Sequence, residues 1–265
     1  MEITTVKSLF LATAAVAALA AAPALAQDGA TVGSAGIAYA NSQADIGPFE
    51  AEGEGAVGDV SVATVVGDWT LTGATQVTYA DSDADFGDNV DVSGSVHVTR
   101  EFGNVRAGGF VSGTDVGDTL WTVGAQAQTY LGNATVGGVA SYGTVKNVDV
   151  WTLGADVGYF VTPDLRIDAN AGYNSIDFDG FDTEALTYGV GGEYKFAGSP
   201  VSVFGGWDRV SLDDADLDID TFSLGVRISF GGDLKARDRS GADLGRKLGG
   251  VTGAVGFLTD FSVAP

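Results

Sequence analysis

The chain lacks cysteine altogether, and its 265 residues include one histidine, one methionine and only five prolines. Without cysteine it can form neither disulfides nor thiolate metal and redox sites. So few prolines exclude a proline-rich linker protein. Basic residues are scarce as well, because 13 lysines and arginines face 35 aspartates and glutamates, which leaves a net charge of −22. Such a charge opposes binding to nucleic acid, so we expect no nucleic-acid partner.

Long apolar runs are missing after residue 26. Residues 1–26 are typical of a secretory signal peptide, because Lys7 precedes an apolar stretch that ends in Ala24-Leu25-Ala26, a small-x-small cleavage pattern. An N-terminal membrane helix is the alternative, and Pro23 argues against it. No later stretch reaches the roughly 18 apolar residues that a membrane helix needs. If the mature chain enters a membrane, it must therefore do so as a closed β-barrel.

The chain is rich in glycine and repeats a strand pattern. It contains 40 glycines, and its mean hydropathy is slightly positive despite the charge. Most of the repeated stretches run large apolar, Ser or Thr, apolar, Gly, and then alternate up to an aromatic residue. They are VSGSVHVTREF from Val92, WTVGAQAQTYL from Trp121, WTLGADVGYF from Trp151, LTYGVGGEYKF from Leu186 and FSLGVRISF from Phe222. The last four start 30, 35 and 36 residues apart, which fits a repeated hairpin.

The connections between these strands alternate in character. Tight turns occur at 102–104, 132–133, 162–164 and 198–200, and longer acidic connections occur at 81–89, 114–118, 176–182 and 213–218. Short turns on one rim and long loops on the other are typical of barrels that cross an outer membrane. We therefore predict an all-β fold, an antiparallel up-and-down transmembrane β-barrel over residues 27–230. Taking 33–42 and 49–66 as the first two strands gives about 12 strands, with 10 or 14 as alternatives.

Aromatic residues gather at the strand ends, whereas glycine and small residues fill the middles. This distribution predicts two aromatic girdles at the membrane interfaces rather than the scattered aromatics of a β-sandwich core. The predicted girdle residues are Trp69, Tyr79, Trp121, Tyr130, Tyr142, Trp151, Tyr159, Tyr173, Tyr194, Trp207 and Phe230.

The chain resembles Gram-negative outer-membrane β-barrel proteins of the porin-like type. The likeness rests on YLGNATVGGVASYG (130–143), TPDLRIDANAGY (162–173) and FSLGVRISFGG (222–232). It implies localisation in the outer membrane, in contact with lipid. From the acidic loops we expect loose contact with lipopolysaccharide, bridged by divalent cations. The last strand is similar to the signal that the barrel-assembly machinery reads, although that signal usually ends the chain. The matching residues are Ser223, Gly225, Ile228 and Phe230.

Alternation assigns charged residues to the lumen. The predicted pore-lining residues are Glu50, Glu52, Glu54, Arg106, Asp156, Arg166, Asp168, Glu193, Lys195 and Arg227. Because the three glutamates are spaced by two, they point the same way and either attract cations or form a wet, partly paired wall. A barrel of 12 strands lies between filled and open ones. We therefore predict a narrow, cation-preferring diffusion channel for small solutes and ions, and the alternative is a lumen closed by ion pairs in a structural or surface-interaction barrel.

No catalytic, metal or cofactor site is predicted. His97 is the only histidine, and Ser95 shares its face, but a satisfied lumen histidine explains the pair better than a catalytic dyad does. The stretch DSDADFG (81–87) has a calcium-loop rhythm without the glycine position and the bidentate glutamate of an EF-hand. We therefore expect a protein that is not an enzyme.

Residues 231–265 differ from the barrel because they hold five of the 13 basic residues. We predict a periplasmic C-terminal tail. It could plug the barrel from below or contact the cell wall, but the absence of helical periodicity favours a loosely ordered extension.

Overall fold

The structure is a computed structural model that describes residues 31–46, 49–82, 89–115, 118–178, 181–212 and 217–248. Twelve strands make up most of it. They are β1 (Thr31–Ile46), β2 (Phe49–Val66), β3 (Trp69–Ser82), β4 (Asn89–Phe102), β5 (Val105–Asp115), β6 (Thr119–Leu131), β7 (Ala134–Val145), β8 (Val148–Thr162), β9 (Leu165–Phe178), β10 (Phe181–Lys195), β11 (Val201–Leu212) and β12 (Leu217–Phe230). The predicted signal peptide lies outside the described residues.

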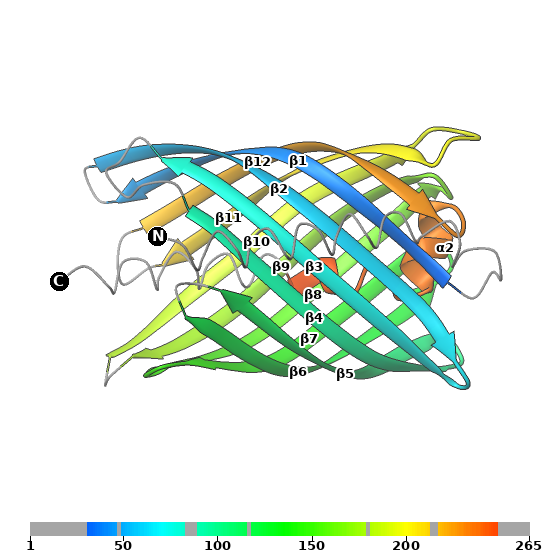
Figure 1. The fold of residues 1–265 in the computed structure, drawn as a ribbon, viewed down its shortest axis with the longest axis horizontal. Helices are drawn as coiled ribbons and strands as arrows, with labels where there is room; N and C mark the ends of the chain where they lie inside the picture. The colour runs from blue at the N-terminus through cyan, green and yellow to red at the C-terminus, as the bar shows by residue number, and fades with distance from the viewer. Residues whose placement is uncertain are drawn as a thin grey trace, which may run out of the picture.

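The strands form one closed antiparallel barrel, in which each strand pairs with its neighbours in the chain and β12 pairs with β1 (Figure 1). The closing pair runs from Gly33 opposite Phe230 to Ile46 opposite Leu217. Closure leaves no sheet edge with unpaired backbone groups, which a bilayer would not tolerate. The predicted count of 12 strands is confirmed, and so is 49–66 as a single strand.

Several strands extend into stretches that the sequence analysis assigned to loops. The connection expected at 176–182 is mostly sheet, because β9 continues to Phe178 and β10 begins at Phe181 directly opposite it. Strand alternation continues through the acidic residues Asp177 and Asp182, whose exposed side chains lie in water rather than lipid. The centres of two other acidic connections, 83–88 and 213–216, lie outside the described residues.

The other end of the barrel has tight turns. Gly67, Gly103, Gly132 and Gly198 occupy these turns with φ values between 61° and 71°, a region that residues with a Cβ rarely adopt. Because short turns of such barrels face the periplasm, we call this the short-turn end and the opposite one the long-loop end. After β12 come a short helix, α2 (Leu234–Arg239), and a 3₁₀ turn, η3 (Gly245–Leu248). No helix in the described part of the chain is long and apolar enough to cross a membrane.

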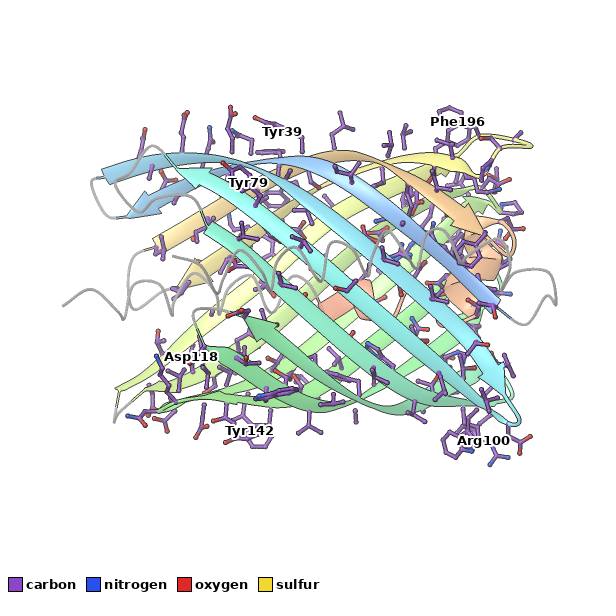
Figure 2. The ribbon with its side chains drawn as sticks, in the orientation of Figure 1. Tyr39, Tyr79, Arg100, Asp118, Tyr142 and Phe196 are labelled. Atoms are coloured by element: carbon purple, nitrogen blue, oxygen red, sulfur yellow. The ribbon has the colours of Figure 1, made fainter. Side chains whose placement is uncertain are left out.

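The outer face of the barrel is apolar and exposed. Leu153 and Leu224 have 64% and 70% of their surface exposed, which only a lipid environment makes favourable. Figure 2 shows Tyr39, Tyr142 and Phe196 on the outside of the barrel wall. Ten of the 11 predicted girdle residues share this outward parity. Tyr130 does not: its hydroxyl accepts a hydrogen bond from Arg106 inside the lumen at 3.1 Å, so its assignment to the girdle is wrong.

Candidate functional site

The C-terminal segment folds back into the lumen. We call residues 233–248 the plug. Figure 1 shows α2 at the short-turn end and η3, in red, farther inside the barrel. The contacts of η3 with β2, β3 and β4 place it against the wall. The expectation of a loosely ordered extension below the barrel is therefore wrong for these residues.

One wall carboxylate, Glu193 of β10, binds the plug most closely. Both terminal nitrogens of Arg237 donate to its two oxygens, at 2.9 and 2.5 Å. The Ser229 hydroxyl accepts a further bond from Arg237 at 2.7 Å, and the Ser202 hydroxyl donates to Glu193 at 2.5 Å. Arg237 is 1% exposed and Glu193 is 7% exposed. A bidentate pair buried this deeply is both directional and strongly coupled to the fold.

A second wall pair crosses the seam where the barrel closes. Arg227 of β12 donates to Glu193 at 3.1 Å and reaches over β1 to Asp59 of β2 at 2.7 Å. Its guanidinium also stacks on Phe204, 4.0 Å from the ring centre. Gly36 of β1 lies beneath this bridge, because a Cβ there would sit 3.0 Å from Asp59 and 3.1 Å from Arg227. The bridge therefore ties three consecutive strands of the closed sheet together from inside.

Within the plug, Asp243 forms ion pairs with several guanidinium groups. It accepts bonds from Arg237 at 2.9 Å and Arg246 at 2.7 Å, and the wall residue Arg166 approaches it at 3.4 Å. Burial alone would raise the pKa of Asp243, but these arginines outweigh burial and hold the pKa well below its ordinary value. Burial lowers the pKa of Arg246 to about 10 against the attraction of Asp243, so Arg246 stays charged at neutral pH.

The wall also binds the main chain of the plug. Arg106 of β5 donates to the carbonyl oxygen of Arg239 at 2.9 Å. The Thr72 hydroxyl donates to the Gly241 carbonyl at 3.1 Å, and the Ser61 hydroxyl donates to the Ala242 carbonyl at 2.5 Å. These donors satisfy carbonyl groups of the plug, together with the Tyr130 hydroxyl, which donates to the Arg239 carbonyl at 3.4 Å, and the Leu244 backbone N–H, which donates to the Gly241 carbonyl at 3.2 Å.

Above the plug, carboxylate and amide side chains face the lumen. Strand register aligns Asp156 of β8 with Asn170 of β9, and the Asn170 amide donates to Asp208 of β11 at 3.3 Å. Asp168 lies one step closer to the plug and pairs with Arg166 at 3.2 Å. Seven of the ten predicted pore-lining residues thus face inward. They are Arg106, Asp156, Arg166, Asp168, Glu193, Lys195 and Arg227.

The three glutamates of β2 do not line the lumen. Glu54 is paired in register with Asn41, on the same outward face as Tyr39, whose hydroxyl interacts with Glu54. Glu50 and Glu52 share its parity, and all three are exposed. Their assignment to the pore is therefore wrong. They can face outward because β2 continues beyond the aromatic girdle, where the outer face meets water.

Ser95 and His97 do form a hydrogen-bonded pair. The His97 Nε2 and Ser95 Oγ atoms are 2.9 Å apart, and Gln126 lies 2.8 Å from Nδ1. His97 is fully buried and stacked against Phe110. Ser95 borders a cavity of about 30 Å³ between the wall and the plug, which has room for roughly two water molecules. The pair thus matches a satisfied core histidine, and the absence of an enzymatic role stays a prediction.

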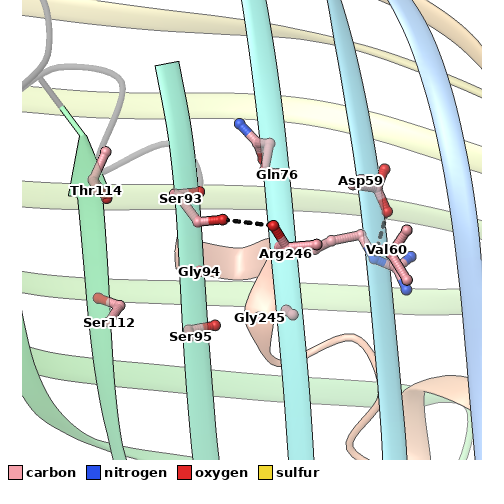
Figure 3. Close-up of a pocket in the computed structure, with 12 residues that line it drawn as sticks. Asp59, Val60, Gln76, Ser93, Gly94, Ser95, Ser112, Thr114, Gly245 and Arg246 are labelled. Carbon is pink, nitrogen blue, oxygen red and sulfur yellow. Dashed lines mark hydrogen bonds and ion pairs between the residues drawn. The ribbon is translucent and has the colours of Figure 1, made fainter. Parts of the chain in front are cut away.

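The same cavity shows how closely η3 fits the wall. Arg246 forms an ion pair with Asp59 at 3.5 Å. Figure 3 shows this pair on one side of the cavity and hydroxyl groups of β4 and β5 on the other. A Cβ on Gly245 would lie 2.1 Å from that of Ala74. Among the described residues, no group of three or more His, Asp or Glu side chains could hold a metal ion.

Near the long-loop end, the inward face carries a cluster of apolar side chains that was not predicted from the sequence. We call it the apolar cluster. Its buried members are Leu120, Val145, Val148, Val150, Ile176, Ala185, Leu212 and Leu217. They lie on the inner wall of β6 to β12, at or above the level of Trp121 and Trp151 of the girdle. The lumen is therefore polar at mid-height and apolar along part of its outer mouth.

Neither the protein-family models nor the curated proteins contain a match to this chain. Solved structures do. The translocator domain of the autotransporter NalP from Neisseria meningitidis matches with a TM-score of 0.52 at 13% identity, over 86% of this chain and 99% of that chain. The KdgM porin in complex with disordered oligogalacturonate matches with a TM-score of 0.50 at 13% identity, over 74% of this chain and 99% of that chain. With its lipid-facing exterior and closed 12-stranded sheet, the chain has the fold of Gram-negative outer-membrane β-barrels.

Proposed function

We propose that the protein is an outer-membrane channel for the passive passage of small ions and solutes, that it prefers cations, and that the plug closes its short-turn half. The observation that carries the proposal is the row of polar and acidic side chains at mid-height, formed by Asp156, Asn170 and Asp208. A lumen filled by packed side chains would not be stabilised by these groups, whereas in a water-filled passage they attract cations.

The charge of the inner wall supports the cation preference. Carboxylates outnumber basic groups on its described inward face. The carboxylates are Asp59, Asp91, Glu101, Asp156, Asp168, Glu193 and Asp208, and the basic groups are Arg106, Arg166, Lys195 and Arg227. The plug itself brings a surplus of arginine and lysine, so its departure would leave the wall more acidic. Conduction and cation preference should therefore increase together.

The docking of the plug suits a movable part. It adds no strand to the sheet and is held mainly by side-chain contacts, such as those of Arg237 and Arg246, beside a backbone hydrogen bond from Lys235 to Pro163 at 3.1 Å. Its removal would break ion pairs and leave the backbone ladder intact. Contact with lipid and lipopolysaccharide and insertion by the barrel-assembly machinery belong to the same proposal, with Ser223, Gly225, Ile228 and Phe230 as the assembly signal.

The experiment is single-channel recording of the refolded full chain in a planar bilayer under a KCl gradient. We expect discrete steps with a cation-selective reversal potential. A Ser61→Cys, Ala242→Cys pair tests the plug, because the parent residues are in hydrogen-bond contact and the chain has no other cysteine. Oxidation should abolish the steps and reduction should restore them, while each single-cysteine variant stays insensitive to both.

A second candidate is the closed structural barrel, which the dense ion pairs between plug and wall favour. Silence from the wild type and from the reduced cysteine pair, in protein shown by circular dichroism to be folded, would contradict the channel and favour this candidate. Steps that persist when the disulfide is confirmed by mass spectrometry would instead show that the plug does not close the pore.

A further inference from the structure

The wall residues around Arg237 form a pocket shaped for a guanidinium group. Glu193 receives both terminal nitrogens, and Ser229 accepts from one of them. Ser202 and Arg227 of the wall also donate hydrogen bonds to the Glu193 carboxylate, at 2.5 and 3.1 Å. The carboxylate is thus fixed by the wall itself. A planar fork of two donors fits this geometry, and the single ammonium group of a lysine does not.

A second subsite lies beside the first, because Ser34 of β1 is paired in register with Ser229 of β12. Arg246 donates to the Ser34 hydroxyl of β1 at 2.7 Å and faces Asp59 of β2 at 3.5 Å. Because Arg227 bridges Asp59 and Glu193, the two subsites belong to one connected piece of wall. The wall therefore offers two neighbouring guanidinium positions.

Between the two arginines in the sequence of the plug, the wall recognises the peptide backbone. Arg106, Thr72 and Ser61 donate to the carbonyl groups of residues 239, 241 and 242. Such contacts use atoms that every peptide carries and do not depend on the side chains of the occupant. Combined with the guanidinium subsites, they describe a ligand with arginine side chains on a peptide backbone.

We propose that the short-turn half of the lumen is a binding site for arginine-containing peptides, which the plug occupies as a resident ligand. This inference builds on the proposed channel, because it names the class of solute that competes with the plug for the wall. A peptide that takes the place of Arg237 would make the same fork with Glu193 and displace the plug segment between Arg237 and Arg246. Peptides of equal charge that carry lysine would not form this fork and would not displace the segment.

The test measures binding by fluorescence anisotropy to the full chain in detergent micelles. The probes are two fluorescein-labelled pentapeptides, Ala-Arg-Ala-Arg-Ala and Ala-Lys-Ala-Lys-Ala. The receptor is the Arg237→Ala, Arg246→Ala variant, which keeps the tail but empties both subsites. We expect the arginine peptide to bind this variant about tenfold more tightly than it binds the wild type, and about tenfold more tightly than the lysine peptide does.

Two further variants locate the binding. In the same background, Glu193→Gln should remove the preference for arginine. Ser229→Ala keeps the charge of the wall and the pairing of Glu193 with Arg227. It should weaken the binding of the arginine peptide several-fold. Equal binding of the two peptides, or binding that neither substitution changes, would overturn the proposal. Unlabelled free arginine that competes as well as the unlabelled pentapeptide would overturn its peptide component.

The readout separates this inference from the channel. Anisotropy in micelles needs no ion current, so a protein that binds the arginine peptide and stays silent in a bilayer contradicts the channel alone. A protein that conducts but does not distinguish the two peptides contradicts the binding site alone.

Discussion

The two halves of the lumen are built by different means. The short-turn half is filled by the plug, and its cohesion comes from buried ion pairs such as those of Glu193 and Arg237. The long-loop half has no such network among the described residues. It combines the apolar cluster at the mouth with accessible polar groups, including Asn170 and Asp208, at mid-height.

Under the proposed function, this difference identifies the plug as the part that changes state. The stabilisation from a buried apolar contact decreases gradually as its surface is exposed to water. A buried ion pair that loses one partner instead leaves the other charge uncompensated. We therefore expect the loss of one charged partner to destabilise the docked plug as a unit. The long-loop half has no comparable element to release.

The largest expected effect comes from Glu193→Gln. The change leaves Arg237 and Arg227 buried without this carboxylate, and breaking such a pair costs about 3–5 kcal/mol. We expect the free energy of unfolding in urea to fall by that amount and channel openings to become more frequent. Glu184→Gln is the matched control, because this glutamate lies on the same strand and is exposed on the outer face. Equal free energies of unfolding for the two variants would contradict the role of Glu193 in holding the plug.

A smaller effect is expected at the seam. Gly36→Val places a side chain under the bridge between Arg227 and Asp59, and such overpacking costs about 1–3 kcal/mol. Gly58→Val on β2 is the control, since no atom lies within 4 Å of a Cβ there. Urea unfolding of the two variants should therefore separate them, with Gly58→Val close to the wild type. A neutral Gly36→Val would mean that the bridge does not hold the seam.

Acid should loosen the plug. Asp243 faces Arg237 and Arg246 of the plug, Arg166 of β9 and Arg227 of β12, which hold its pKa below the ordinary value. A carboxyl group with a lowered pKa stabilises the folded state fully above its unfolded pKa of about 4 and loses that contribution as the pH falls further. Openings in a bilayer should be equally rare from pH 8 to 5 and increase severalfold by about pH 3.5.

The control for this prediction is Asp243→Asn, which removes the titrating group. It should open more often than the wild type already at pH 7 and respond less to acid. An increase in wild-type openings between pH 8 and 5 would point to a different group as the sensor.

The barrel itself could be predicted from the sequence because its signals are repeated. Alternation, glycine mid-strand and aromatic strand ends recur about every 35 residues from Trp121 onward, so an error in one strand does not change the count. The extent of the strands was harder to predict. Acidic residues beyond the girdle continue the sheet in water, and composition alone made them look like loops.

The error on β2 had a signal that could have corrected it. If Glu50, Glu52 and Glu54 faced the lumen, Asp59 would have opposite parity and its charge would face lipid at mid-strand. Only the reverse assignment puts Asp59 inside, as observed. Likewise, Tyr130 has the parity of Gln128, which faces inward, so alternation outweighs its position at a strand end.

The plug could not be predicted from its own sequence. A helix of six residues has too few turns to show a periodic pattern. Its docking depends on wall residues from distant strands, such as Ser61, Arg166 and Glu193, which only barrel closure brings to one place. The five basic residues of the tail were a usable signal for an acidic partner, although they did not identify which one.

The smallest expected effect separates lumen charge from outer charge. Asp208→Asn removes a charge from the passage, and one charge at roughly 10 Å in water contributes about 0.4 kcal/mol, so we expect the cation preference to fall about twofold. Glu52→Gln removes an equal charge from the outer face above the girdle and should leave selectivity unchanged. Both should alter stability by less than about 0.5 kcal/mol, because neither carboxylate is deeply buried. Reversal potentials under a KCl gradient measure the difference. Equal shifts would mean that selectivity arises from the field of the whole acidic rim rather than from the mid-height row.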